Sequence, residues 1–166
     1  SDLGKRATLW AQDFAIALGE VELRLDGLRL RGLRGATGTQ ASYLGLLGGD
    51  RTKVDDLERR FAAKLGWPAD RTWAVCGQTY PRLADAQVLG SLAVAAAAVH
   101  KCCNDLRLLA NLKEVEEPIE KEQIGSSAMA YKRNPMRSER INSLARFVLS
   151  LEGNANQTHS VQYFER

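Results

Sequence analysis

The longest regular hydrophobic pattern in the chain runs from about residue 82 to residue 117. Its apolar positions recur every seven residues, each followed three residues later by another: Leu92, Val99 and Leu106, then Ala95, Cys102 and Leu109. This is the a/d spacing of a helix that packs in a bundle. About 35 residues at about 1.5 Å each make a helix of about 50 Å. Such a helix is too long for the core of one small domain, so we expect other long helices beside it, from other chains.

Four further segments have the composition or periodicity of helices: residues 3–30, 40–47, 51–64 and 136–151. Asp50 is placed to cap the third of these helices, and Gly153–Asn154 is expected to end the fourth. Glycines interrupt residues 32–39, which predicts a loop. Residues 72–80 are expected to be irregular or extended. The sequence therefore predicts an all-α protein built as a long-helix bundle.

Composition and charge exclude few classes of protein. The chain has 166 residues and a formal net charge of +3, which suits one domain and does not require a nucleic acid partner. No apolar run reaches the roughly 18 residues that span a bilayer, so no membrane partner is expected. The three cysteines are odd in number and two are adjacent, which argues against a disulfide framework and favours a cytoplasmic protein. No Cys-x-x-Cys or histidine-rich spacing indicates a metal site.

The candidate chemistry lies in residues 125–135, which read Gly-Ser-Ser-Ala-Met-Ala-Tyr-Lys-Arg-Asn-Pro. A serine hydroxyl is too weak an acid to lose its proton unaided at neutral pH. The cations Lys132 and Arg133, together with backbone N–H groups, are able to stabilise its alkoxide or to hold a carboxylate or phosphate. By these residues alone, a solvated basic loop before a helix is the simpler interpretation.

The spacing Gly-Ser-Ser-x-Met-x-x-Lys-x-Asn-Pro resembles the signature of the fumarase/aspartase superfamily. Five further segments are similar to the adenylosuccinate lyase family within it: residues 34–42, 77–80, 108–114, 131–140 and 160–166. The resemblance implies that residues 1–166 form the central helical-bundle domain of the fumarase/aspartase type. It also implies that the N-terminal and C-terminal domains, and an acidic histidine upstream of Ser1, lie outside this chain.

The resemblance implies a β-elimination that releases fumarate from adenylosuccinate, leaving AMP, and from the related succinyl-carboxamide imidazole ribotide of purine biosynthesis. No cofactor or metal is implied, and the partners are a small-molecule substrate and a homotetramer. The chain alone is expected to be inactive. A non-catalytic helical assembly module of the same family remains the alternative, and nucleic-acid binding through the basic residues near Lys132 is a weaker one.

The resemblance also assigns roles to individual residues. Ser126 matches the general base, and Lys132 and Asn134 match contacts to the succinyl carboxylates. The residues that match catalytic positions are Ser126, Lys132 and Glu139. Those that match substrate-binding positions are Gln78, Ser127, Met129, Asn134, Arg140 and Arg166, the two arginines on the nucleotide side.

Two residues depart from the pattern of the family. Ala130 stands where proline is usual, which we expect to make the serine loop more mobile. His159 stands where a small residue is usual, and we interpret it as a surface or interface histidine rather than as the missing acid. His100, on the long helix, is expected to be structural.

Overall fold

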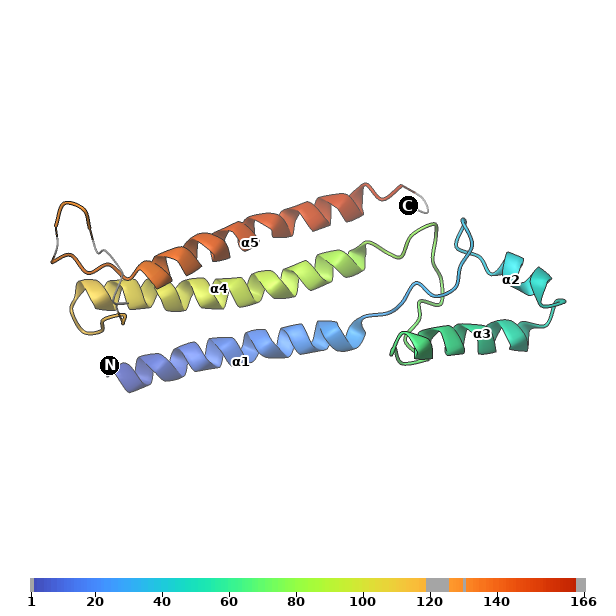
Figure 1. Ribbon diagram of the computed structural model, residues 1–166, viewed down its shortest axis with the longest axis horizontal. Coiled ribbons are helices and arrows are strands. Elements are labelled where there is room, and N and C mark those ends of the chain that lie inside the picture. Colours follow the sequence, from blue (N-terminus) through green and yellow to red (C-terminus); the bar gives the residue numbers. More distant parts are fainter. Residues whose placement is uncertain (1, 119–125, 130, 164–166) are drawn as a thin grey trace. The chain divides into compact units, whose positions relative to one another are not determined.

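The computed structural model describes residues 2–118, 126–129 and 131–163. In this part of the chain the helices are α1 (Leu3–Gly27), α2 (Ala41–Leu46), α3 (Arg51–Lys64), α4 (Leu83–Asn111) and α5 (Met136–Ser160) (Figure 1). The remaining described residues form loops and one isolated bridge between Leu30 and Thr72. The predicted all-α fold is therefore confirmed.

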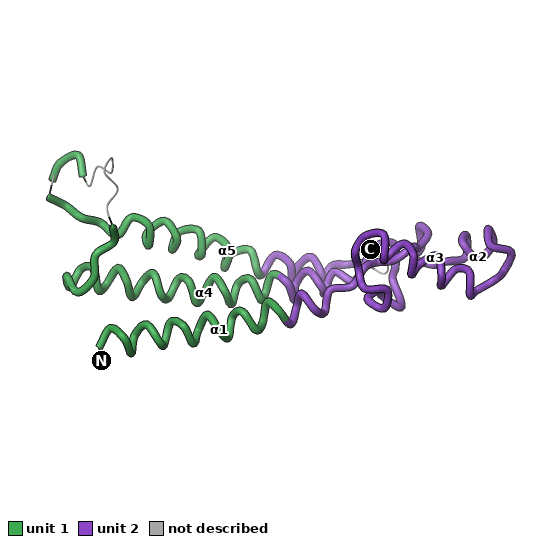
Figure 2. The backbone as a smooth tube through the Cα atoms, turned by 60° about the horizontal axis from the view of Figure 1, so that its bottom comes forward, with its two compact units in different colours: residues 1–22, 89–152 green, residues 23–88, 153–166 purple. Residues whose placement is uncertain are grey.

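The chain divides into two compact units, which Figure 2 shows in different colours. Unit 1 contains residues 1–22 and 89–152, and unit 2 contains residues 23–88 and 153–166. Helices α1, α4 and α5 contribute residues to both units.

The sequence placed most helix boundaries within a few residues, and two differences have clear physical causes. Helix α4 ends at Asn111, before Pro118, because Lys113 adopts a left-handed φ of 58°. The amides of Lys113 and Glu114 then bond back to the carbonyls of Ala110 and Leu109 at 3.1 and 3.0 Å, which is the Schellman pattern.

The second difference lies in α5, which continues through Gly153 to Ser160. The prediction that Gly153–Asn154 would end this helix is wrong. A glycine in a helix costs about 1 kcal/mol relative to alanine. Ala155, two residues further on, is only 7% exposed, and packing at that position outweighs the local cost.

Unit 1 is held together by small buried side chains and by polar contacts between helices. Its buried apolar residues are Ala17, Ala93, Cys103, Leu109 and Ala145. Trp10 on α1 donates from Nε1 to Asp105 of α4 at 2.7 Å, and Asn142 on α5 donates to Asn104 of α4 at 2.8 Å. Helix α4 therefore contacts both α1 and α5, and it lies between them in Figure 1.

The large apolar side chains of unit 1 are mostly not buried within this chain. Leu92 of the seven-residue pattern is 43% exposed, although Leu109 of the same pattern is 4% exposed. Other large apolar residues of this unit with substantial exposure are Leu9, Ile16, Leu18, Leu108, Leu144 and Phe147. The helices of unit 1 thus bury mainly small residues against each other and leave most of their large apolar residues uncovered.

Helix α4 also corrects the expectation about membrane-spanning segments. By length and composition alone it is long and apolar enough to cross a bilayer. One such helix is weak evidence, because the core helix of a globular protein has the same length and composition. Its polar residues are engaged with neighbouring helices: Lys101 pairs with Asp13 at 3.3 Å, and Asp105 accepts from Trp10.

Unit 2 is organised around a largely buried ion pair. Arg34 and Glu58 form this pair, with their side chains 7% and 14% exposed. Glu58 also accepts hydrogen bonds from the Leu33 amide and the Gln40 side chain, both at 3.2 Å. The glycine-rich loop is thereby fixed to α3. That helix begins as predicted, with the Asp50 carboxylate accepting from the amides of Thr52 and Lys53.

Candidate functional site

Ser126 lies in a tight turn that its own hydroxyl helps to build. Its Oγ atom accepts hydrogen bonds from the backbone N–H groups of Ala128 and Met129, both at 3.2 Å. The side chain of Ser126 is half-buried, whereas Ser127 is exposed. Two N–H donors that point at one oxygen stabilise negative charge on that oxygen. The geometry therefore favours an alkoxide at Ser126 over one at Ser127.

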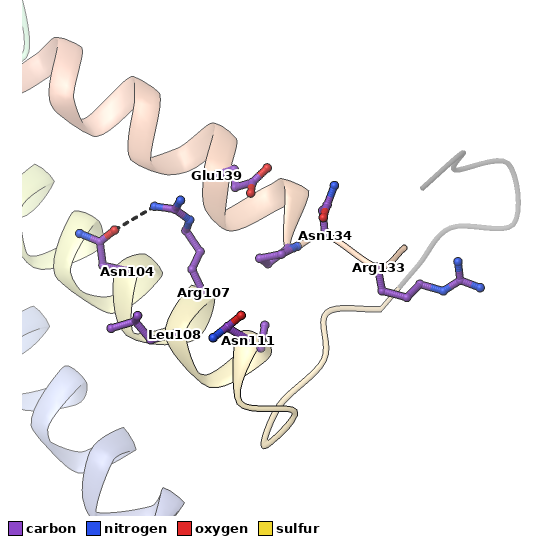
Figure 3. A pocket seen from close by; sticks show the side chains of 9 residues that line it. Asn104, Arg107, Leu108, Asn111, Arg133, Asn134 and Glu139 are labelled. Carbon is purple, nitrogen blue, oxygen red and sulfur yellow. Dashed lines mark hydrogen bonds between the residues drawn. The ribbon is translucent and has the colours of Figure 1, made fainter. Parts of the chain in front are cut away.

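A pocket of about 550 Å³ lies in unit 1 between the C-terminal part of α4 and the start of α5 (Figure 3). The residues that line it are Asn104, Arg107, Leu108, Ala110, Asn111, Arg133, Asn134, Pro135 and Glu139. The site residues predicted from the sequence contribute Asn134 and Glu139 to this lining. Glu139 lies in the first turn of α5, where the helix dipole favours a carboxylate.

The α4 side of this pocket was not predicted as functional. Arg107 extends from α4 toward α5 and donates to Asn104 Oδ1 at 3.2 Å, while Arg133 points away from α4 (Figure 3). Asn104, Arg107 and Asn111 are polar positions at helical spacing in the C-terminal part of α4. That spacing, three and then four residues, places them on one face. This shared helix face is the feature of the sequence from which these three residues could have been predicted.

The first turn of α5 is capped by Glu117, which precedes the serine loop in the chain. Its two carboxylate oxygens accept from the amides of Arg137 and Ser138 at 3.0 and 2.9 Å, and also from the Ser138 hydroxyl. Burial raises the pKa of the Glu117 carboxyl, but these hydrogen bonds and the charge of Arg137 lower it more. The net pKa lies below its ordinary value of 4.5. Glu117 thus joins the start of the loop to its end.

We expect Glu117→Gln to loosen the start of α5, because the neutral amide offers one acceptor oxygen and no charge to the helix N-terminus. Amide hydrogen exchange of residues 136–140 in the full-length protein should become about tenfold faster at neutral pH. Because the folded pKa is lowered, the stabilisation by Glu117 is present above its ordinary pKa and is lost as the pH falls through the folded value. Glu116→Gln, at the exposed neighbouring position, serves as the control. Equal protection in the two variants would contradict the capping role.

Gln78 belongs to unit 2, in a turn that several side chains hold in place. Arg31 donates to the carbonyl oxygens of Gly35 and Gly77 at 2.9 and 3.2 Å. A Cβ atom added to Gly38 would lie 2.0 Å from the Cys76 carbonyl oxygen. The glycine-rich loop and the turn before Gln78 are therefore in close backbone contact, with the Gln78 side chain exposed.

The remaining predicted site residues lie in less enclosed surroundings. Lys132 and Arg140 are exposed in unit 1, and Met129 is 38% exposed; neither these three nor the two serines line the pocket between α4 and α5. Arg166 lies outside the described residues, as does Ala130. Among the residues that the structure describes, no three His, Cys, Asp or Glu side chains gather as metal ligands.

The two histidines and the adjacent cysteines lie on helices α4 and α5. The side chain of His100 lies within 3.1 Å of Asn104 Nδ2 on the same helix. His159 is half-buried and lines a cavity in unit 2, whereas the serine turn belongs to unit 1. Burial raises the pKa of the Cys102 and Cys103 thiols, which disfavours reactive thiolates.

Comparison with known proteins agrees with the motif. The model of a family described as "Lyase" matches residues 8–150. Proteins named adenylosuccinate lyase from Saccharomyces cerevisiae, Schizosaccharomyces pombe and Schistosoma mansoni are 56%, 53% and 47% identical to this chain. Each match covers 99% of this chain and 34% of the relative.

This chain therefore spans about a third of the length of the curated relatives that it matches. The family match extends over most of the chain, including the serine turn, the pocket between α4 and α5, and the turn that carries Gln78. On this evidence the chain belongs to the lyase family.

Proposed function

We propose that this chain is the central part of an adenylosuccinate lyase, which releases fumarate from adenylosuccinate and from the succinyl-carboxamide imidazole ribotide. The observation that carries the proposal is the Ser126 turn, in which two backbone N–H groups point at the hydroxyl oxygen of the predicted base. The names of relatives that match along 99% of the chain support the same substrate class.

In the proposed reaction Ser126, as its alkoxide, removes a proton from the succinyl carbon next to a carboxylate. The electron pair of that C–H bond becomes the double bond of fumarate. The bond from the neighbouring carbon to nitrogen breaks, and an acid outside this chain supplies a proton to the nitrogen of the departing AMP. Each cycle therefore requires one base and one acid, and only the base belongs to this chain.

The cations and amides near Ser126 serve the charged intermediate in this proposal. Lys132 and Asn134 hold the carboxylates, whose negative charge increases when the carbon loses its proton. Glu139 orients neighbouring groups from the first turn of α5. Arg140 and Arg166 bind the nucleotide, because a guanidinium can bind two phosphate oxygens at once, and Gln78 binds substrate.

We further propose that the chain works in a cytoplasmic homotetramer. The support is the set of large apolar side chains that α1, α4 and α5 leave uncovered, such as Leu92 at 43% and Phe147 at 61% exposure. Many exposed large apolar side chains on the helices of one chain are typical of surfaces that other chains cover. Long helices from further copies would bury them.

A segment exchange tests the proposal. This chain replaces the matching third of the Saccharomyces cerevisiae enzyme, and the hybrid is assayed for conversion of adenylosuccinate to AMP and fumarate by the change in ultraviolet absorbance. We expect the kcat of the hybrid to lie within about tenfold of the kcat of the parent enzyme. The reason is that more than half of the aligned residues are identical in this chain and in the Saccharomyces cerevisiae protein. The isolated 166-residue chain is expected to be inactive. A folded, tetrameric hybrid without activity would contradict the enzymatic role and favour the assembly module.

A further inference from the structure

We infer that Gln162 is a positioning residue for substrate binding, because its side chain fixes the turn that carries Gln78. The inference rests on the proposed function, in which Gln78 contacts the substrate. Gln162 follows the last turn of α5 and is separated from the turn by about 80 residues of sequence, yet both belong to unit 2. In Figure 1 the short segment after α5 lies near the loop that precedes α4, in agreement with the hydrogen bond between Arg82 and Gln162.

The amide group of Gln162 uses both of its ends on this turn. Its Oε1 atom accepts from the backbone N–H of Arg82 at 3.0 Å. Its Nε2 atom donates to Thr79 Oγ1 at 3.3 Å and to the Tyr80 carbonyl oxygen at 3.4 Å. The amide accepts on its oxygen and donates from its nitrogen, so a carboxylate or an aliphatic residue cannot reproduce this set.

The backbone is held by hydrogen bonds on both sides of Gln78. On one side, Arg31 donates to the Gly77 carbonyl oxygen at 3.2 Å. On the other side, Gln162 holds Thr79 and Tyr80. The exposed Gln78 side chain is therefore presented from a backbone that is held immediately before and after it.

The far end of the turn is already braced without Gln162. Tyr80 donates to Asp85 at 2.9 Å, and the Arg82 guanidinium donates to the Tyr80 hydroxyl at 2.9 Å. The guanidinium also lies 4.7 Å from the centre of the Tyr80 ring. Loss of Gln162 is therefore expected to free residues 78 and 79 more than residues 80–85, which makes its effect specific to Gln78.

The test uses a full-length lyase that carries this segment, with Gln162→Met as the variant, because methionine has a similar length and cannot form these hydrogen bonds. We expect the KM for adenylosuccinate to rise about tenfold, with kcat within about threefold of the parent, because only binding is weakened. In a Gln78→Ala background the same substitution should change KM by less than about twofold, because the residue it positions is gone. Gln157→Met, at an exposed glutamine of α5, is the matched control and should leave KM unchanged.

Each result has a definite meaning. If Gln78→Ala raises KM while Gln162→Met leaves it unchanged, or if the two effects add fully, the inference is overturned and the proposed function stands. If Gln78→Ala itself leaves KM unchanged, the substrate role of Gln78 fails and this inference fails with it. Should Gln162→Met not assemble, Thr79→Val compared with Thr79→Ser repeats the test on the acceptor side. A KM that is higher in Thr79→Val than in Thr79→Ser supports the inference, and equal KM values in the two variants overturn it.

Discussion

Ser126→Ala in a full-length lyase carrying this segment is expected to lower kcat about 10³-fold and to change KM little. The hydroxyl is the group that removes the substrate proton in the proposed reaction, and loss of a general base typically costs about 10²–10⁴-fold. The two amide donors at 3.2 Å would then face a methyl group. Substrate contacts from other residues remain, so binding is largely retained.

The measurement is the initial rate of fumarate release, with circular dichroism and native mass to show that the variant folds and assembles. Ser127→Ala is the matched comparison, since that serine is adjacent and exposed. We expect it to lose much less activity, below about tenfold. If Ser127→Ala were the inactive variant and Ser126→Ala kept normal turnover, the base would be assigned to the wrong serine and the proposed mechanism would fail.

Gly38→Ala is expected to have the largest effect on stability, with a loss of about 3 kcal/mol or more. Gly38 has φ of +81°, a region that L-residues with a side chain rarely adopt. A Cβ atom there would lie 2.0 Å from the Cys76 carbonyl oxygen and 2.5 Å from that of Gly77. These are backbone atoms and cannot turn away, so the glycine-rich loop and the turn before Gln78 must separate.

Thermal unfolding and the KM for adenylosuccinate in the full-length protein measure both consequences. Gly45→Ala is the control, because nothing lies within 4 Å of its added Cβ and the residue is in α2. That change is expected to raise stability by up to about 1 kcal/mol, the ordinary gain for alanine over glycine in a helix. An unchanged melting temperature for Gly38→Ala would mean that the contact with Cys76 is not as close as described.

The helices were predictable where local signals agree. Asp50 was identified as a cap because Asp is favoured before a helix, and its carboxylate accepts from the amides of Thr52 and Lys53. The predictions failed where packing or an unusual backbone decided the outcome. Gly153 remains inside α5, and Lys113 takes a left-handed conformation that glycine usually takes. The residue types at these two positions do not predict either conformation.

The candidate site was predictable to a similar degree. The spacing of residues 125–135 identified the serine loop, because a motif of neighbouring residues can be read directly from the chain. Arg107 was missed, although its helical spacing from Asn104 and Asn111 was present in the sequence. Glu117 and Gln162 were missed because each bonds to residues far away in the sequence. Nothing in their immediate neighbourhoods indicates those partners.

The sequence by itself determined the all-α class, the approximate helices, the serine loop and the family, because propensity and motif spacing depend on neighbouring residues. Only the tertiary structure decided that Glu117 caps α5, that Gln162 braces the Gln78 turn and that Gly38 packs on Cys76. The physical reason is that hydrogen bonds and close backbone contacts act at about 3–4 Å. Which distant residues come within that range is set by the folded chain.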